Sequence, residues 1–286
     1  MNFDLTEDQK AIADLASEFA QKKVKPLRAE YDEKEEYPVQ VLEEMRKVDL
    51  FGLWLPEAYG GVGGGIATLC AAVEQLSRVD AAITMPVATS ALGAMPILLY
   101  ATDEQRSRWL PDIASGRKLA AFAITEPEAG SDATAQKTTA RADGGHYVLN
   151  GQKHYCSSGG ISDLYVVFAS TNPAKGARGI SAFVVDKNTP GFRLGKKEKK
   201  LGIKANPTYE LHFEDCRVPA ADRLGGEGFG LFVLQETFDY SRPGVAAQAV
   251  GIAQGALDET VPYLRARKQF GQSVASFQAI SHRLAE

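Results

Sequence analysis

Cysteine and histidine are scarce in this sequence, with three cysteines and four histidines among 286 residues. The cysteines form no CxxC pair and their number is odd, which argues against a disulfide scaffold. The histidines show no HxxxH spacing, so no metal site is predicted from either residue type. Free cysteines without a metal motif are typical of a reducing compartment, and we expect a cytoplasmic protein.

A strong charge of one sign is also missing. The net charge is −4 and the sequence pI is about 5.7, so electrostatics gives no reason to expect a nucleic acid or an anionic membrane as partner. The basic run at 196–200 has no interleaved aromatic residues and is better explained as a solvated hairpin. The first ten residues mix acidic and apolar side chains, so no targeting peptide is predicted.

Uncharged stretches are short, with one exception that resembles a membrane span. Residues 81–102 carry no charge and are long enough to cross a bilayer. They include Pro86, Gly93 and Pro96, and their large apolar side chains are sparse. We interpret this stretch as a helix that is buried inside the protein, which its prolines could interrupt, and we expect no membrane span.

What the sequence does contain is a pattern that changes from helix to strand and back. Residues 1–117 repeat their apolar side chains at helical spacing, and Thr6 with Gln9 forms a capping box. Residues 118–226 show short apolar runs between Gly, Pro, Asn and Asp, which is typical of a β-sandwich or barrel. Residues 227–286 are helical again. The predicted fold is therefore an α+β multidomain chain with an N-terminal helical domain, a central β-barrel or sandwich domain, and the start of a C-terminal helical bundle.

The β region contains one strong turn signal. Asn150-Gly151 predicts a two-residue hairpin turn between strands at 147–149 and 153–157. Tyr155 and Ser157 are two residues apart on the second strand and should share one face. Further strands are predicted at 164–169, 180–185 and 209–213.

The last helical region is apolar on two faces. Val245, Ala249 and Ile252 lie on one stripe, and other apolar residues form a second. A further helix begins near Phe277, and the sequence reaches Glu286 within it. We expect an incomplete bundle whose exposed faces are covered by an oligomer or by residues beyond Glu286.

Four strings lie at the junctions of these regions and occur in a fixed order. They are AITEPEAGSD at 123–132, NGQK at 150–153 followed by Tyr155, FD at 238–239 followed by SRP at 241–243, and RKQFG at 267–271 followed by Gln278. Together they resemble the acyl-CoA dehydrogenase family of flavoproteins, over the whole length of the chain.

The resemblance implies an FAD cofactor and an acyl-CoA thioester substrate. The implied reaction is α,β-dehydrogenation, in which a proton leaves Cα and a hydride passes from Cβ to the flavin. Electrons would then pass to electron-transferring flavoprotein, and the assembly would be a homotetramer built as a dimer of dimers. It also implies domains at 1–117, 118–226 and 227–286, the last one incomplete. Two alternatives remain open: a flavin-linked acyl-CoA oxidase, and a flavin-free, non-catalytic fragment or oligomerisation module.

The resemblance leaves the catalytic base unassigned. The glutamate that most members use is expected beyond Glu286. A minority of members place the base at the position of Ser241, and a serine cannot serve as that base. The catalytic residue is therefore unknown, and the 286-residue chain alone is predicted to be nearly inactive.

The resemblance carries over a set of binding residues. The implied cofactor-binding residues are Phe122, Ala123, Ile124, Thr125, Gly130, Ser131, Tyr155, Cys156, Ser157, Arg267, Gln269 and Gln278. The implied substrate-binding residues are Ser131, Asp239, Ser241 and Arg242, and no metal ligand is implied. Arg267, Gln269 and Gln278 are expected to reach the flavin diphosphate across a subunit interface.

Ordinary structural roles compete with several of these assignments. Without the resemblance, Thr125 is more simply a half-buried strand threonine. Asp239 and Arg242 are three residues apart, which also suits a weak surface ion pair. Cys156 is better explained as a small buried hydrophobe than as a nucleophile. His154 and His212 are assigned to ordinary strand positions.

Overall fold

The N-terminal region folds as a helical layer in the computed structural model, which describes residues 4–286. Its helices are α1 (Glu7–Phe19), α2 (Arg28–Lys34), α3 (Gln40–Arg46), α4 (Gly65–Val79), α5 (Ala81–Tyr100) and α6 (Asp103–Ala114), and a π-helical turn follows α1 at Ala20–Val24. The predicted capping box is confirmed, since Gln9 N donates to Thr6 Oγ1 at 3.2 Å and Thr6 N donates to Gln9 Oε1 at 3.0 Å. Thr102 and Gln105 form a second capping box at the start of α6 that the sequence analysis did not note.

Helix α5 confirms the interpretation of the uncharged stretch as a buried helix. It runs without interruption through Pro86 and Pro96. Among the described residues it is the one helix long and apolar enough to cross a bilayer, but 72% of that window is buried inside the protein. Asp80 begins it by accepting a hydrogen bond from Ile83 N at 2.7 Å. Buried apolar side chains surround it, so packing within the protein explains its composition.

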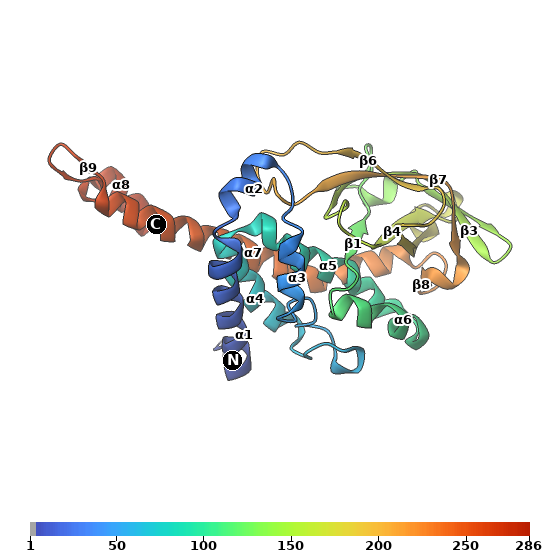
Figure 1. The fold of residues 1–286 in the computed structure, drawn as a ribbon. Coiled ribbons are helices and arrows are strands. Elements are labelled where there is room, and N and C mark those ends of the chain that lie inside the picture. Colours follow the sequence, from blue (N-terminus) through green and yellow to red (C-terminus); the bar gives the residue numbers. More distant parts are fainter. Residues whose placement is uncertain (1–3) are drawn as a thin grey trace.

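The middle region is an eight-stranded mixed sheet with the order β6-β7-β3-β2-β4-β5-β8, and β1 pairs with β4. The strands are β1 (Ala120–Ala123), β2 (Thr139–Asp143), β3 (His146–Ser157), β4 (Leu164–Ser170), β5 (Ile180–Asp186), β6 (Phe192–Lys197), β7 (Thr208–Pro219) and β8 (Arg223–Leu224). Alternate residues of β4 and β5 face either the helices or a second core that β3 and β7 complete. The sheet therefore curls over its own core and rests on the helical layer (Figure 1).

The predicted hairpin turn at Asn150-Gly151 is wrong. Strand β3 passes straight through both residues, and the β2–β3 turn lies at Gly144-Gly145, which have φ values of 53° and 83°. Two consecutive positive φ values are what a type I′ turn needs. Gly151 instead lies at a register shift beside Thr138, where an added Cβ would come within 2.6 Å of Thr138 Oγ1.

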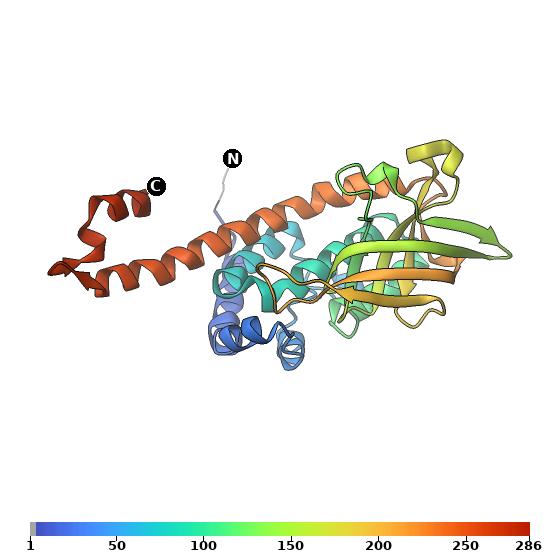
Figure 2. The ribbon, with the colours of Figure 1, turned by 90° about the horizontal axis from the view of Figure 1, so that it is seen from above.

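The C-terminal region is dominated by α7 (Gly230–Ala266), a 37-residue helix. Figure 2 shows α7 running along the helical layer and past the body, with its far end carrying β9 (Lys268–Gln269), β10 (Gln272–Ser273) and α8 (Gln278–Ala285). It approaches α4 through glycines, since a Cβ on Gly251 or Gly255 would lie 2.2 or 2.1 Å from a carbonyl oxygen of α4. The predicted apolar stripe is largely exposed within this chain, as expected for an incomplete bundle, with Val245 61% and Ile252 44% exposed.

Short 3-10 segments connect these elements. They lie at Glu57–Tyr59, Ala133–Ala135, Pro173–Gly179, Ala220–Asp222 and Val274–Ser276.

Candidate functional site

A pocket of about 180 Å³ opens where β1, β3, α5 and α7 meet. Its lining residues are Thr89 and Leu92 from α5, Phe122, Ile124 and Thr125 at the end of β1, His154, Tyr155 and Ser157 from β3, and Phe238 from α7. The pocket thus brings together five residues that the sequence analysis assigned to the flavin, from two strings about thirty positions apart.

Backbone pairing explains why the two strings meet. His154 N donates a hydrogen bond to Thr125 O at 2.7 Å, which fixes the chain after β1 against β3. The register between β3 and β7 shifts between Lys153 and Cys156, and Tyr155 has a φ of 56°. Such a bulge changes the direction in which the side chains of the bulged strand point. Tyr155 and Ser157 both line the pocket as predicted, but a bulge and not simple alternation places them there.

Aromatic rings form the apolar part of the wall. The Phe122 ring lies 5.1 Å from the Phe168 ring and 5.8 Å from the Phe238 ring, between centroids. Tyr155 is 63% exposed, an unusual position for a large aromatic side chain. A flat aromatic ligand could stack on these rings.

Hydroxyl groups provide the polar part of the wall. Thr89 Oγ1 is already engaged with Ser158 Oγ at 2.7 Å. The hydroxyls of Thr125 and Ser157, in contrast, make no hydrogen bond within residues 4–286. Two hydroxyls without a partner match the polar edge of a flavin ring, and the neighbouring aromatic side chains match its faces.

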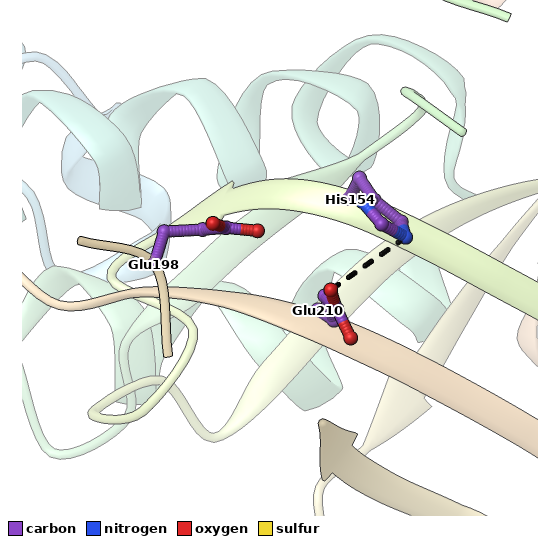
Figure 3. Close-up of side chains that lie close together, drawn as sticks. All are labelled: His154, Glu198 and Glu210. Atoms are coloured by element: carbon purple, nitrogen blue, oxygen red, sulfur yellow. Dashed lines mark ion pairs between the residues drawn. The ribbon is translucent and has the colours of Figure 1, made fainter. Parts of the chain in front are cut away.

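His154 lies on strand β3 as predicted, and its side chain also lines the pocket, which the sequence analysis did not indicate. Its ring lies 5.7 Å from that of Tyr155, edge to face. Its Nε2 lies 3.9 Å from Glu210 Oε1, and the ligand atoms of His154, Glu198 and Glu210 all lie within 4.8 Å of one another (Figure 3). The signal that could have identified it is its place next to the predicted aromatic residue.

This histidine and the two carboxylates could hold a divalent metal by residue type. All three side chains are only half-buried. Among residues 4–286 no Lys or Arg side chain pairs with Glu198 or Glu210, and Glu210 lies between His154, at 3.9 Å, and His212, at 3.5 Å, so ordinary ion pairing accounts for the same geometry.

Two of the predicted cofactor residues do not present their side chains to the pocket. Ala123 and Cys156 are 1% exposed and pack in the second core. The packing of Cys156 in this core agrees with the prediction of a small buried hydrophobe, and burial raises the pKa of its thiol to about 12. Gly130 and Ser131 lie outside the pocket lining, on an exposed loop between β1 and β2.

The predicted substrate residues lie on α7 next to Phe238. Arg242 donates to Asp239 Oδ1 at 3.1 Å, and its guanidinium lies 5.5 Å from the Phe238 ring. Ser241 is buried and its hydroxyl donates to Phe238 O at 3.4 Å. No Asp or Glu side chain is among the residues that line the pocket within the described chain.

Arg267, Gln269 and Gln278 lie apart from the pocket. They are at the far end of α7 and on β9 and α8, at the opposite end of the chain from the sheet (Figure 2). All three side chains are exposed. Within one chain, the structure does not bring them to the residues near Tyr155.

Three family models match the chain in order. They are the acyl-CoA dehydrogenase N-terminal domain at residues 6–117, the middle domain at 121–216 and the C-terminal domain at 227–286. The chain belongs to the acyl-CoA dehydrogenase family. The chain is therefore an FAD-dependent oxidoreductase by family, and the predicted family, enzyme class and cofactor are confirmed.

Relatives of known name support the same assignment. The short-chain specific acyl-CoA dehydrogenase of Clostridium acetobutylicum is 42% identical over all of this chain, which covers 76% of that protein. The solved structure of butyryl-CoA dehydrogenase from Megasphaera elsdenii matches with a TM-score of 0.96 at 41% identity, covering 100% of this chain and 76% of that one.

A third match comes from a solved structure of the electron transferring flavoprotein of Acidaminococcus fermentans. A chain in that structure has a TM-score of 0.97 and 45% identity, with 100% of this chain and 75% of that chain covered. The helix–sheet–helix order predicted from the sequence is confirmed by these structures. Acyl-CoA dehydrogenation is the general activity that the matches support.

Proposed function

We propose that the pocket between β1 and β3 holds the flavin ring of FAD during α,β-dehydrogenation of an acyl-CoA thioester. The observation that carries this is the convergence of Thr125, Tyr155 and Ser157 on one pocket beside Phe122. Bound FAD would supply the acceptor for the hydride that leaves Cβ after a proton leaves Cα. Electrons would pass on to electron-transferring flavoprotein, as the match to a chain of the Acidaminococcus fermentans structure suggests.

The side chains around the pocket would position this ring. The Thr125 and Ser157 hydroxyls would donate to its polar edge, because neither has another partner within residues 4–286. Tyr155 and Phe122 would contact its faces and exclude water. The pocket is smaller than the roughly 300–1,000 Å³ of a complete ligand site, so it would enclose only part of the cofactor.

The remaining cofactor residues would act on the flavin diphosphate. Gly130 and Ser131 offer backbone N–H groups and one hydroxyl on the loop after Thr125. Arg267, Gln269 and Gln278 lie too far from this pocket to serve it in the same chain, so they would serve the site of another subunit. This arrangement requires at least a second copy of the chain and is consistent with the proposed homotetramer, and Arg267 suits it because a guanidinium binds phosphate in a fixed fork.

Substrate would enter beside α7, where Asp239, Ser241 and Arg242 follow the pocket residue Phe238. The apolar neighbours Leu92 and Phe238 suit an acyl chain. No carboxylate lines the pocket among residues 4–286, so the glutamate base that the resemblance implies would come from outside this lining.

The test is a titration of the purified chain with FAD, followed by quenching of flavin fluorescence. The double variant Tyr155→Ala with Ser157→Val should bind FAD at least about ten-fold more weakly, since one lost hydrogen bond to a buried polar group costs about 1–3 kcal/mol. Tyr263→Ala is a matched control, because Tyr263 is 62% exposed and lies far along α7. Equal affinity of the double variant and wild type would contradict the proposed site.

The same titration decides between the alternatives. A flavin-free fragment or oligomerisation module would bind no FAD. An oxidase-type enzyme would bind it through the same pocket, but its photoreduced flavin would be reoxidised rapidly by air. Slow reoxidation is the result expected for a dehydrogenase that passes electrons to electron-transferring flavoprotein.

A further inference from the structure

One lysine of this chain is completely buried. Lys153 lies on β3 with no exposed surface, among the largest fully buried side chains. Its ammonium uses all three of its donors. It donates to Glu126 Oε1 at 2.6 Å, to Gln136 Oε1 at 3.0 Å and to Ile124 O at 3.2 Å.

Glu126 is the matching buried carboxylate, 6% exposed. Besides Lys153 it accepts hydrogen bonds from the backbone N–H groups of Lys137, at 2.5 Å, and Thr138, at 3.1 Å. Its own backbone pairs with Ala129 in an isolated bridge. One carboxylate thus ties together both ends of the loop at 124–138, which connects β1 to β2.

This loop carries the residues that the flavin would meet after β1. Thr125 lies between Ile124 and Glu126, which both contact Lys153, and its carbonyl accepts from His154 N at 2.7 Å. Gly130 and Ser131 lie within the same loop. The buried pair is therefore the link between the loop and the strand that carries Tyr155.

We propose that Lys153 and Glu126 are a positioning pair, which holds the loop at 124–138 in the geometry that binds the cofactor. The inference rests on the proposed function of the pocket. Neither side chain lines the pocket near Tyr155, so the pair acts through Thr125 and the loop backbone and not by touching the flavin.

The physical cost of burying two charges favours this role over simple stabilisation. Burial lowers the pKa of Lys153 to about 8, against the opposing effect of Glu126. Burial also raises the pKa of Glu126, but the Lys153 ammonium and the hydrogen bonds to it outweigh burial and hold this pKa below its usual value. An apolar pair of similar volume is often as stable as a buried ion pair. What an apolar pair cannot do is bind the N–H groups of Lys137 and Thr138.

The experiment separates positioning from stability. The double variant Lys153→Met with Glu126→Leu removes both charges together, so no unpaired buried ion remains and the chain should still fold, with a modestly lower unfolding midpoint because two N–H groups lose their acceptor. Hydrogen exchange of the Lys137 and Thr138 amides should become at least ten-fold faster. FAD should bind at least ten-fold more weakly.

Two further variants complete the design. Lys200→Met is the matched control, since Lys200 is a partly buried lysine that donates to Asn206 O at 2.6 Å and Thr208 Oγ1 at 3.1 Å, away from the loop. It should leave loop exchange and FAD affinity unchanged. Gln136→Met keeps both charges and removes one acceptor of Lys153, together with the 3.3 Å hydrogen bond from Gln136 Nε2 to Ala133 O within the loop. It should give a smaller change in the same two readouts, even if the double variant fails to fold.

Wild-type protection of the Lys137 and Thr138 amides in the double variant, or faster exchange with unchanged FAD affinity, would overturn the proposal. If the double variant fails to fold, an unchanged Gln136→Met variant would overturn it. A wild-type chain that binds no FAD at all would contradict the proposed function instead, and the exchange data would still decide whether the pair holds the loop.

Discussion

Single residues in this chain take their roles from backbone detail that the sequence does not display. Tyr155 faces the pocket because a bulge gives it a φ of 56°. Cys156, its neighbour, is turned into the second core. Simple alternation along the strand correctly predicted that Tyr155 and Cys156 point to opposite sides, but it did not predict the bulge. The hairpin turn predicted at Asn150-Gly151 was wrong for a similar reason. A register shift within a strand, like a turn, can use a glycine with positive φ.

Cysteine reactivity follows from the same placement. Burial raises the pKa of Cys156 to about 12 and that of Cys216 to about 11, whereas Cys70 is only partly buried. Burial therefore keeps both thiols in the neutral form, which is not the nucleophilic one, and also shields them from reagents. At mildly alkaline pH, a thiol reagent should label at most Cys70 in the folded chain and all three cysteines after unfolding in guanidinium chloride.

The control for this labelling is Cys156→Ala. It should leave labelling of the folded chain unchanged and remove one label from the unfolded chain. Rapid labelling of Cys156 in the folded wild type would contradict its assignment to the core.

Among the elements, the helices themselves were easier to predict than the surfaces against which they pack. Capping at Thr6 and the uncharged run at 81–102 defined two helices correctly, because both signals are local in sequence. The face that α7 uses was not predictable in this way. Its apolar stripes indicated faces that need a partner, whereas glycines make the contact with α4, because close approach of two backbones depends on both helices.

Glycine substitutions on α7 test this contact. A Cβ at Gly255 would lie 2.1 Å from Arg78 O, so Gly255→Ala should destabilise the fold by about 1–3 kcal/mol through overpacking. At Gly244 an added Cβ meets nothing within 4 Å, so Gly244→Ala should stabilise the helix by about 0.5–1 kcal/mol. Urea unfolding of both variants measures the two signs. Two changes of the same sign would contradict the glycine contact.

For the whole molecule, four short strings in order were enough to predict the family and cofactor, and the helix–sheet–helix architecture followed from periodicity. The pocket also contains five of the predicted cofactor residues. The resemblance also implied that Arg267, Gln269 and Gln278 act across a subunit interface, but sequence reasoning could not show what separates them from the pocket. Arg267, Gln269 and Gln278 are separated from the pocket by the length of α7, a distance that only the three-dimensional path reveals.

Catalytic activity also depends on the whole molecule, because the pocket lining within residues 4–286 contains no carboxylate that could act as the base. General-base assistance is worth about 100- to 10,000-fold, so the 286-residue chain loaded with FAD should turn over butyryl-CoA at least about 100-fold more slowly than the Clostridium acetobutylicum relative. Dye reduction measures this rate.

Ser241→Glu places a carboxylate beside Phe238 and should raise the rate, whereas the neutral control Ser241→Gln should not. Turnover by the wild-type chain at the rate of the relative would show that the base is already present.

The central claim is that the pocket between β1 and β3 binds the flavin ring. A crystal structure of the chain with saturating FAD tests it most directly. The flavin edge should lie within hydrogen-bond distance, about 2.7–3.2 Å, of Thr125 Oγ1 and Ser157 Oγ, with Tyr155 and Phe122 against its faces. FAD bound elsewhere, or no bound FAD at saturation, would contradict the account.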